Sequence, residues 1–289
     1  MKKKILITGK GSYIGSNFRA YLEQDQEHYI IDELDMQNDG WHAYDFSGYD
    51  VVYHVAGLAH STPKESEREL YYRVNTDLTH EVAKKAKQSG VKQFIFMSSI
   101  IVYGSGEIGQ DRIITKNTPL TPDNFYGDSK KQAEQKIAPL ADEQFKVVIL
   151  RPPMVYGRDS KGNYPMLAKF AKKTPVFPNI KNERSMLYLG NLLEFVKLMI
   201  DNEESGIFLP QNKEYVCTSQ LVHTIAKLYQ HKIMFTKLFN PLIMLCGKNT
   251  YVNKVFGNFT IDKELSAYRE DYNKYSFEES IRLTERIRE

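Results

Sequence analysis

The chain has 289 residues, enough for one large or two small domains, and its 42% hydrophobic and 26% charged residues are ordinary for a globular protein. The formal net charge of +3 comes from interspersed acidic and basic residues, which excludes a dense basic surface for nucleic acid. Two cysteines, Cys217 and Cys246, exclude a disulfide framework, and cysteines and histidines are nowhere closely spaced, so we expect no metal.

The hydrophobic runs do not indicate membrane insertion. The apolar run after Lys2–Lys4 is three residues long, against the roughly 7–15 of a secretion signal. The run Pro241–Cys246 is far shorter than the roughly 20 residues that span a bilayer. We therefore expect a soluble cytoplasmic protein.

Strand-like and helix-like segments alternate through the first 150 residues. Short apolar runs predict strands and a 3.6-residue periodicity predicts helices. The expected strands are 4–8, 29–34, 50–56, 93–98 and 146–150, and the expected helices are 16–24, 66–89 and 122–137. This alternation predicts βαβ units and a mostly parallel sheet covered on both faces.

The alternation weakens in the second half, where helical stretches at 163–173, 190–202 and 219–230 are separated by loops. We predict an α/β protein with a Rossmann-type, doubly wound, mostly parallel sheet over residues 1–155. A smaller C-terminal α/β substrate lobe is expected over 156–289. The helix 190–202 is also compatible with a return to the first domain.

The first expected strand leads directly into a glycine-rich turn. Its residues after the strand are Gly9, Lys10, Gly11, Ser12, Tyr13, Ile14 and Gly15. Glycines between a strand and a helix permit a tight turn and close approach of the backbone to a pyrophosphate at the helix N-terminus. The segment predicts dinucleotide binding.

A carboxylate near the end of the second strand is expected to bind the adenosine ribose. Asp35 lies 20 residues after Gly15 and ends the strand, whereas Asp32 lies inside it, so Asp35 is favoured. An acid here repels a 2′-phosphate and favours NAD over NADP. In the following loop, Asp45 and Phe46 are candidates for flanking the adenine.

Tyr126 and Lys130 have the spacing of an acid/base pair. On a helix, residues four apart project to one face, and a nearby positive charge favours a phenolate. Ser98 and Ser99 lie at the carboxyl end of an expected strand, where ligands bind in parallel sheets. These residues are candidates for proton transfer.

Several motifs, taken in chain order, resemble those of extended short-chain dehydrogenases/reductases. They are Thr8-Gly9…Gly15, Val55-Ala56-Gly57, Asn75, Ser98-Ser99…Val102-Tyr103-Gly104, Tyr126…Lys130 and Arg151-Pro152…Val155-Tyr156-Gly157. Over essentially its whole length the chain is similar to the NAD-dependent nucleotide-sugar epimerase/dehydratase family, of the UDP-glucose/UDP-galactose 4-epimerase type. It departs from the family at Ser12, where the middle of three turn glycines is usual.

The resemblance implies a role for each matching residue. Tyr126 would exchange a proton with a sugar hydroxyl, Lys130 would hold the nicotinamide ribose and lower the phenol pKa, and Ser99 would bond the reacting oxygen, with Ser98 next in line. It also implies a homodimer formed through the Tyr126 helix and the helix 66–89. Further contacts to NAD are implied for Val55, Ala56, Gly57, Asn75 and Pro153.

The second lobe is expected to bind the nucleotide diphosphate. Arg184 resembles the family's diphosphate-binding arginine, and arginine suits bidentate phosphate contacts. Asn163, ahead of a helix, and Lys254 are further candidates for substrate contacts. His54 is interpreted as a hydrogen-bonded core histidine, and His60 as a candidate for approaching the substrate.

The residues after Ser99 bear on the reaction. A 4,6-dehydratase of this family usually has Asp-Glu there, whereas this chain has Ile100 and Ile101, which cannot act as acid or base. We expect a 4-epimerase of a UDP-hexose or UDP-N-acetylhexosamine that works through a transient 4-keto sugar in surface-polysaccharide or sugar-nucleotide metabolism. Met154 is a candidate substrate contact where many epimerases have asparagine.

Two alternatives remain open. Met154 and the short second lobe also occur in 4-ketoreductases that use NAD(P)H and a UDP-4-keto-6-deoxy sugar. A non-catalytic dinucleotide sensor of the same fold is the second alternative, although intact Ser99, Tyr126 and Lys130 speak against it.

Overall fold

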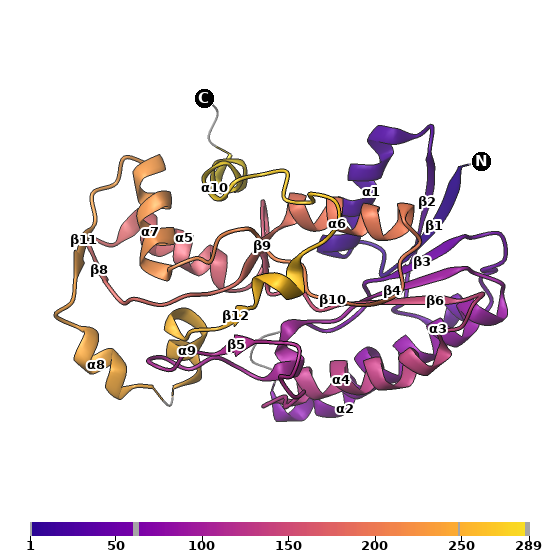
Figure 1. Ribbon diagram of the computed structural model, residues 1–289, viewed down its shortest axis with the longest axis horizontal. Coiled ribbons are helices and arrows are strands. Elements are labelled where there is room, and N and C mark those ends of the chain that lie inside the picture. The colour runs from indigo at the N-terminus through magenta and orange to yellow at the C-terminus, as the bar shows by residue number, and fades with distance from the viewer. Residues whose placement is uncertain (1, 60–63, 248, 287–289) are drawn as a thin grey trace. The chain divides into compact units, whose positions relative to one another are not determined.

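The structure is a computed structural model that describes residues 2–59, 64–247 and 249–286. It divides into two compact units, and Figure 1 labels their elements along the chain. The first unit contains residues 1–102, 120–152 and 193–209, and the second contains 103–119, 153–192 and 210–289.

The first unit is built on a six-stranded sheet in which every neighbouring pair is parallel. The strand order in the sheet is β10-β6-β4-β3-β1-β2. Strand β2 lies on one side of β1, and the later strands are added on the other side, as in a doubly wound sheet. The predicted Rossmann-type sheet is confirmed. The strands are β1 (Lys3–Thr8), β2 (Tyr29–Leu34), β3 (Val51–His54), β4 (Gln93–Met97), β6 (Lys146–Leu150) and β10 (Gly206–Phe208).

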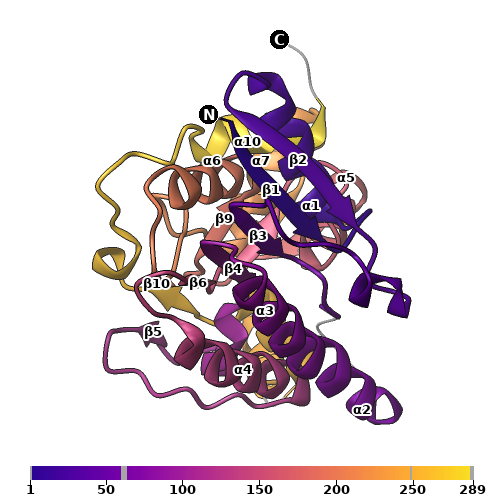
Figure 2. The ribbon, with the colours of Figure 1, turned by 90° about the vertical axis from the view of Figure 1, so that its right-hand side faces the viewer.

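Helices cover both faces of this sheet (Figures 1 and 2). One face is covered by α1 (Tyr13–Leu22) and α6 (Leu189–Asp201), and the other by α3 (Leu78–Gln88) and α4 (Phe125–Ile137). Strand residues that face α3 and α4, such as Phe94 and Phe96, are fully buried with them in one apolar cluster. Burial on both faces explains why these strands read as continuous apolar runs.

The helix expected over 66–89 is interrupted. It begins with a 3₁₀ turn and the short helix α2 (Arg68–Tyr71), continues as a π-helical segment, Tyr72–Asp77, and becomes regular only in α3. The π segment contains the predicted cofactor residue Asn75, and such segments are frequent at functional sites.

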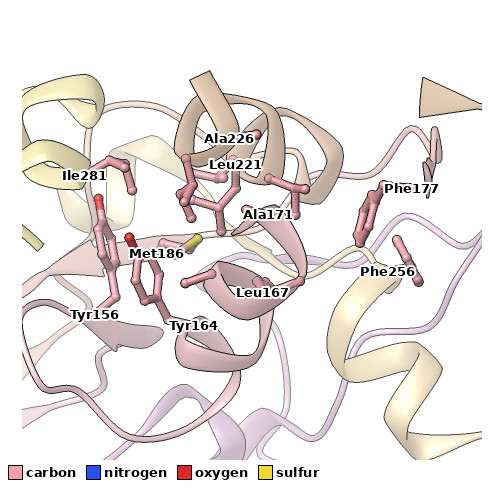
Figure 3. Packing of buried hydrophobic residues seen from close by; sticks show 14 of the residues in the cluster. Tyr156, Tyr164, Leu167, Ala171, Phe177, Met186, Leu221, Ala226, Phe256 and Ile281 are labelled. Carbon is pink, nitrogen blue, oxygen red and sulfur yellow. The ribbon is translucent and has the colours of Figure 1, made fainter. Parts of the chain in front are cut away.

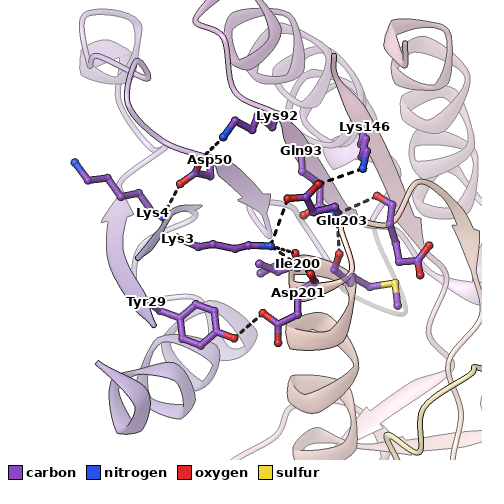
Figure 4. A network of polar contacts seen from close by, with 12 residues as sticks. Lys3, Lys4, Tyr29, Asp50, Lys92, Gln93, Lys146, Ile200, Asp201 and Glu203 are labelled. Carbon is purple, nitrogen blue, oxygen red and sulfur yellow. Dashed lines mark hydrogen bonds and ion pairs between the residues drawn. The ribbon is translucent and has the colours of Figure 1, made fainter. Parts of the chain in front are cut away.

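The N-terminal edge of the sheet is tied to the end of α6 (Figure 4). The Lys3 ammonium donates to the carbonyl oxygen of Ile200 at 2.6 Å, and the Tyr29 hydroxyl donates to the Asp201 carboxylate at 2.6 Å. A cation at a helix C-terminus is favourable because the last carbonyls are otherwise unpaired. These contacts hold the end of α6 in the first unit. They lie at the amino ends of β1 and β2, opposite the carboxyl ends of the strands, where the candidate site residues are found.

Over its described residues, the second unit has three two-stranded parallel pairs and five α-helices. The pairs are β5 (Ile113–Ile114) with β12 (Thr260–Ile261), β7 (Met154–Tyr156) with β9 (Met186–Tyr188), and β8 (Val176–Pro178) with β11 (Met234–Thr236). The helices are α5 (Asn163–Lys173), α7 (Thr218–Leu228), α8 (Asn240–Leu245), α9 (Thr250–Phe256) and α10 (Phe277–Glu285).

The core of the second unit is rich in aromatic residues (Figure 3). The rings of Tyr156 and Tyr164 stack with centroids 5.3 Å apart, and Leu221 and Ile281 pack in the same cluster. The segment 103–119 lies in this unit because its strand β5 pairs with β12, so the units do not divide at a single point near 155. Over the described ranges, no helix combines the length and apolarity needed to cross a membrane.

Candidate active site

The first turn of α4 holds Tyr126 against the turn that follows β4. Asn124 caps the helix, because its Oδ1 accepts from the backbone N–H of Gly127 at 2.9 Å. A Cβ at Gly127 would lie 2.7 Å from the carbonyl oxygen of Ile101. Only glycine therefore permits α4 to approach this turn so closely. The Tyr126 ring packs edge-on against Tyr71, with centroids 6.0 Å apart.

The two adjacent serines at the end of β4 have different partners. The buried Ser98 hydroxyl donates to Oε1 of Glu134 at 2.5 Å, and the same carboxylate is ion-paired with buried Arg151. The half-buried Ser99 hydroxyl accepts from the N–H of Ile101 at 3.3 Å, and its interaction with the Tyr126 phenol favours a lower pKa of that phenol. Ser99 is thus the serine that meets the phenol.

Glu134 was not predicted as a site residue. It lies one helical turn after Lys130, and its side chain is bound by Arg151 at 3.0 Å and 2.5 Å. The signal in the sequence was an acid four residues after Lys130, on the helix face that carries Tyr126 and Lys130. The pair joins α4 to the end of β6 and keeps both charges compensated where they are buried.

Lys130 is buried and points to the end of β4. Its ammonium donates to the carbonyl oxygen of Met97 at 2.9 Å and lies 4.6 Å from the centre of the Phe96 ring. Burial lowers the pKa of Lys130 to about 8. Burial also raises the pKa of Tyr126 to about 12, with the hydrogen bond to Ser99 opposing the rise. Lys130 is not among the groups that shift the Tyr126 pKa in the chain alone, so its expected effect on the phenol stays a prediction.

Asn75 connects the turn after β3 with α4. Its Oδ1 accepts from the N–H of Leu58 at 2.8 Å, and its Nδ2 donates to the Leu58 carbonyl at 3.1 Å and to the Ser129 hydroxyl at 3.0 Å. A Cβ at Gly57 would lie 3.0 Å from Asn75 Oδ1 and 3.1 Å from the Lys130 ammonium. The predicted residues Gly57, Asn75 and Lys130 are therefore brought together.

The glycine turn lies beside the same segment. Gly9 has φ of +113°, and a Cβ there would lie 2.8 Å from the backbone nitrogen of Ala56, which follows Val55 and β3. Gly11 also has positive φ, +75°. Ser12 caps α1, since its hydroxyl accepts from the N–H of Gly15 at 3.2 Å. The helix consequently begins at Tyr13, so Tyr13 and Ile14 belong to its first turn.

The candidate ribose and adenine residues differ in their surroundings. Asp35 follows β2, is half-buried, and accepts from the N–H of Gln37 at 2.9 Å. Asp32 accepts a 2.8 Å hydrogen bond from the Tyr49 hydroxyl. Because Leu34 O accepts from the N–H of Gly9 at 2.9 Å, Asp35 directly follows a residue bonded to the glycine turn.

The two residues predicted to flank the adenine, Asp45 and Phe46, differ in burial. The exposed Asp45 carboxylate accepts hydrogen bonds from Ser47, which lower its pKa. The Phe46 side chain is fully buried in the core with Trp41, so it presents no ring face to a ligand. Its predicted side-chain contact with adenine is therefore not supported by this burial.

His54 is a core histidine, as predicted. Its Nδ1 is 2.7 Å from the Thr8 hydroxyl and its Nε2 is 3.0 Å from the Thr79 hydroxyl. Burial, with a smaller effect of the Lys130 charge, lowers the pKa of His54 to about 3. Thr79 in turn donates to the Asn75 carbonyl at 2.8 Å. His60 lies outside the described residues.

The predicted substrate residues of the second unit surround α9. The half-buried Arg184 donates from Nη1 to the carbonyl oxygens of Asn253 and Gly257, at 3.2 Å and 2.6 Å, and burial lowers the pKa of its guanidinium to about 10. Asn163 donates to the Lys254 carbonyl at 3.2 Å. Among the residues that the structure describes, no carboxylate pairs with Arg184.

Pro153 and Met154 lie where the chain enters the second unit. Pro153 is buried, and Met154 opens β7 opposite Met186 and packs against the aromatic core. The Ser99, Tyr126 and Lys130 side chains all belong to the first unit, whereas Arg184, Asn163 and Lys254 belong to the second. Sequence reasoning missed Asn253, whose Oδ1 accepts from the N–H of Ile108 at 2.9 Å and which helps to position α9.

The sequence matches a known family profile. Residues 5–217 match the family described as "NAD dependent epimerase/dehydratase family". The chain is 31% identical to the UDP-glucose 4-epimerase of Vibrio cholerae, over 91% of this chain and 88% of that protein. It is 30% identical to the N-acetyl-alpha-D-glucosaminyl-diphospho-ditrans,octacis-undecaprenol 4-epimerase of Escherichia coli O157:H7, over 86% of this chain and 78% of that one.

The fold is also found among solved structures. The crystal structure of UDP-glucuronic acid 4-epimerase from Bacillus cereus in complex with NAD superposes with a TM-score of 0.74. The two chains are 17% identical, and the alignment covers 97% of this chain and 96% of that one.

Proposed function

The chain belongs to the NAD dependent epimerase/dehydratase family, and we propose that it interconverts the C4 epimers of a UDP-hexose or UDP-N-acetylhexosamine. It is an NAD-dependent nucleotide-sugar epimerase. The proposal for C4 depends on the interaction of Ser99 with Tyr126, on the buried Lys130 one helical turn after Tyr126, and on Ile100 and Ile101 directly after Ser99. These two isoleucines supply no acid or base for eliminating water, and both relatives named above are 4-epimerases.

The residues of the first unit fit NAD. Gly9 and Gly57 leave room along the turn after β3 that a Cβ atom would occupy. Helix α1 begins after its N-cap residue, Ser12, in the glycine turn. We propose that this turn contacts the pyrophosphate and that Asp35 binds the adenosine ribose. When bound, NAD supplies the acceptor and later the donor of the hydride exchanged with the sugar.

The proton steps are assigned to Tyr126 and Ser99. With a pKa of about 12, the Tyr126 phenol keeps its proton at neutral pH in the protein alone, which suits donation to a 4-keto oxygen. Removal of a proton from the sugar hydroxyl requires the Tyr126 phenolate, which a nearby positive charge favours. We assign the stabilisation of this phenolate to Lys130, one helical turn away. We assign to Ser99 the hydrogen bond that orients the reacting oxygen.

The diphosphate is assigned to Arg184. Its guanidinium is held by two backbone carbonyls at the end of α9, which orient it without neutralising its charge. Burial makes that charge costly, as the lowered pKa shows, and an incoming anion would offset the cost. Asn163 and Lys254, which meet at the same helix, are assigned to the substrate as well.

One experiment tests the reaction. Purified protein is examined for bound NAD by absorbance and is then incubated with a panel of UDP-sugars, while the stereochemistry at C4 is followed by NMR. We expect interconversion without added cofactor. Consumption of NAD(P)H in proportion to a 4-keto-6-deoxy sugar would instead identify a 4-ketoreductase. NAD binding without turnover of any sugar would identify a sensor.

A lipid-linked sugar is a second candidate substrate class. It is favoured by the relative from E. coli, whose name places the N-acetylglucosaminyl group on a diphospho-undecaprenol. The same NMR assay with a short-chain polyprenyl diphosphate N-acetylhexosamine distinguishes the two classes. Faster turnover of the lipid-linked sugar than of every UDP-sugar would replace the first candidate.

We further propose a cytoplasmic homodimer, acting in surface-polysaccharide or sugar-nucleotide metabolism, in which α3 and α4 of each protomer form the contact. These helices pack on one another through α3 residues such as Val82 and α4 residues such as Ala133. Sedimentation velocity of the purified chain tests this, and a monomer at all concentrations would contradict it.

A further inference from the structure

The second unit exposes a concentrated apolar surface around α8. Leu238, Leu242 and Leu245 are 78%, 64% and 83% exposed, and no residue of α8 is buried. We call the α8 surface the exposed apolar side chains of this region: Leu238, Phe239, Leu242, Met244, Leu245 and Tyr251. Isolated exposed leucines are ordinary, but a contiguous run of them marks an interaction site.

The helix is attached to the unit through its other side. Ile243 packs against the aromatic core, and the Asn240 amide donates to the Asn179 carbonyl at 2.9 Å. A Cβ at Gly109 would lie 2.7 Å from the Met244 methyl group, so the loop at Gly109 also contacts the helix. Helix α8 is therefore packed on the second unit while Leu242 and Leu245 remain exposed.

The charge of the surrounding segment has a single sign. Acidic residues make up 36 of 289 positions, about one in eight, yet residues 215–261 contain none and contain five lysines. Lys237 directly precedes Leu238 in this segment. The nearest acids of the supporting loop, Glu107 and Asp111, are hydrogen-bonded at 2.8 Å by Gln110 and Asn258.

The exposed apolar side chains and the surrounding lysines together indicate which kind of partner the α8 surface binds. A second copy of the chain, meeting this one across a two-fold axis, would bring lysines against the same lysines. An anionic lipid surface accepts both components, because apolar side chains insert at the acyl boundary while lysines meet lipid phosphates. Helix α8, with six residues, is too short to span a bilayer and suits an interfacial position.

We propose that the α8 surface docks the second unit on an anionic lipid membrane. The docking does not depend on the reaction proposed above. Helix α9, whose Asn253 and C-cap residue Gly257 bind Arg184 through their carbonyls, begins five residues after α8 ends. The proposed diphosphate-binding residues would consequently lie near the membrane surface.

Vesicle flotation with the purified full-length chain tests the proposal. The vesicles are phosphatidylcholine alone or phosphatidylcholine mixed with phosphatidylglycerol. The test variant is Leu242→Gln with Leu245→Gln, a second variant is Lys232→Gln with Lys237→Gln, and the control is Leu283→Gln. Leu283 is an exposed leucine on α10 of the same unit, in a helix that carries glutamates.

We expect the wild-type chain and Leu283→Gln to float with the anionic vesicles at low salt, and the leucine double variant to bind at least about tenfold more weakly. The lysine double variant should lose mainly the preference for anionic over neutral vesicles. Turnover of a soluble UDP-sugar should be unchanged in every variant, which separates docking from the reaction. Absence of wild-type flotation, or equal flotation of the leucine double variant, would overturn the proposal. A wild-type dimer that the leucine double variant dissociates, without vesicle binding, would show a contact between copies instead.

Discussion

The Ser98 hydroxyl donates a 2.5 Å hydrogen bond to Glu134, and this bond leaves its neighbour Ser99 as the serine that meets Tyr126. The substitution Ser99→Ala should lower kcat by about 10²–10³-fold, because it removes a hydroxyl from the proposed proton-transfer site. Its unfolding free energy should change little.

Ser98→Ala is the matched control for Ser99→Ala. It should retain kcat within a few-fold but lose about 1.5–3 kcal/mol of unfolding free energy, since a buried charged acceptor loses a donor. Steady-state kinetics and urea unfolding measure both effects. The reverse pattern, with activity lost in Ser98→Ala alone, would contradict the assignment.

Tyr126→Phe should abolish turnover while leaving NAD affinity within a few-fold. The substitution keeps the ring that packs against Tyr71 and removes only the hydroxyl to which we assign the proton exchange. Isothermal titration with NAD and the NMR assay with the preferred sugar measure the two effects. Retained activity would rule out the mechanism.

The buried ammonium of Lys130 should make stability depend on pH. Its pKa is about 8 in the fold and 10.5 in the reference state, so below pH 8 the folded state carries a charge that costs about 3 kcal/mol. Between these values the unfolded chain binds more protons, and the unfolding free energy therefore rises with pH.

Lys130→Met lacks this pH dependence of the unfolding free energy. Its unfolding free energy should exceed that of the wild type most below pH 8, and the difference should shrink toward pH 10.5. Urea unfolding of both proteins at pH 7 and pH 10 measures the difference. A constant difference across that range would show that the ammonium is not the cause. The variant should also lose turnover, which is read separately.

Gly9 and Gly11 should respond differently to alanine. Both have positive φ, but only at Gly9 would a Cβ meet backbone, 2.8 Å from the nitrogen of Ala56. Gly9→Ala should abolish NAD binding and lower stability, whereas Gly11→Ala should cost only about 1–2 kcal/mol of backbone strain. Thermal unfolding and NAD titration measure this, and equal losses would contradict the close approach.

Arg184→Met should weaken UDP binding by about 30-fold or more while NAD binding stays unchanged, because the residue belongs to the second unit and is assigned to the diphosphate. Lys213→Gln, which removes an exposed cation of the same unit, is the control and should bind UDP normally. Calorimetric titration with UDP measures both. Unchanged affinity in Arg184→Met would remove it from the site.

The expected elements of the first 150 residues match the structure in type and nearly in bounds, because strand burial and helical periodicity are local properties. Strand 29–34 and helix 163–173 have the predicted bounds, and the helix expected from 16 begins at Tyr13 because Ser12 caps it. The π segment around Asn75 was not predictable, since it depends on bonds to Leu58 and Ser129, 17 and 54 residues away in sequence.

The short strands of the second unit were also missed. Strands β5 and β12 have two residues each, and neither has a periodic pattern that a sequence can reveal. They exist because residues far apart pair after folding, as Ile113 does with Thr260. Similarly, Pro241–Cys246 reads only as a short apolar run, and its attachment by Ile243 and exposure of Leu245 depend on the packing around it.

The sequence by itself determined the glycine turn, the helical spacing of Tyr126 and Lys130, and the order of strands and helices, because each depends on residues close together in the chain. Tertiary structure alone decided that the Ser98 hydroxyl binds Glu134, that the Phe46 ring is buried, and that burial raises the pKa of Tyr126. These outcomes depend on distances between segments and on the loss of solvent. Ser98 and Glu134 are separated by 36 residues, and no local pattern encodes their contact.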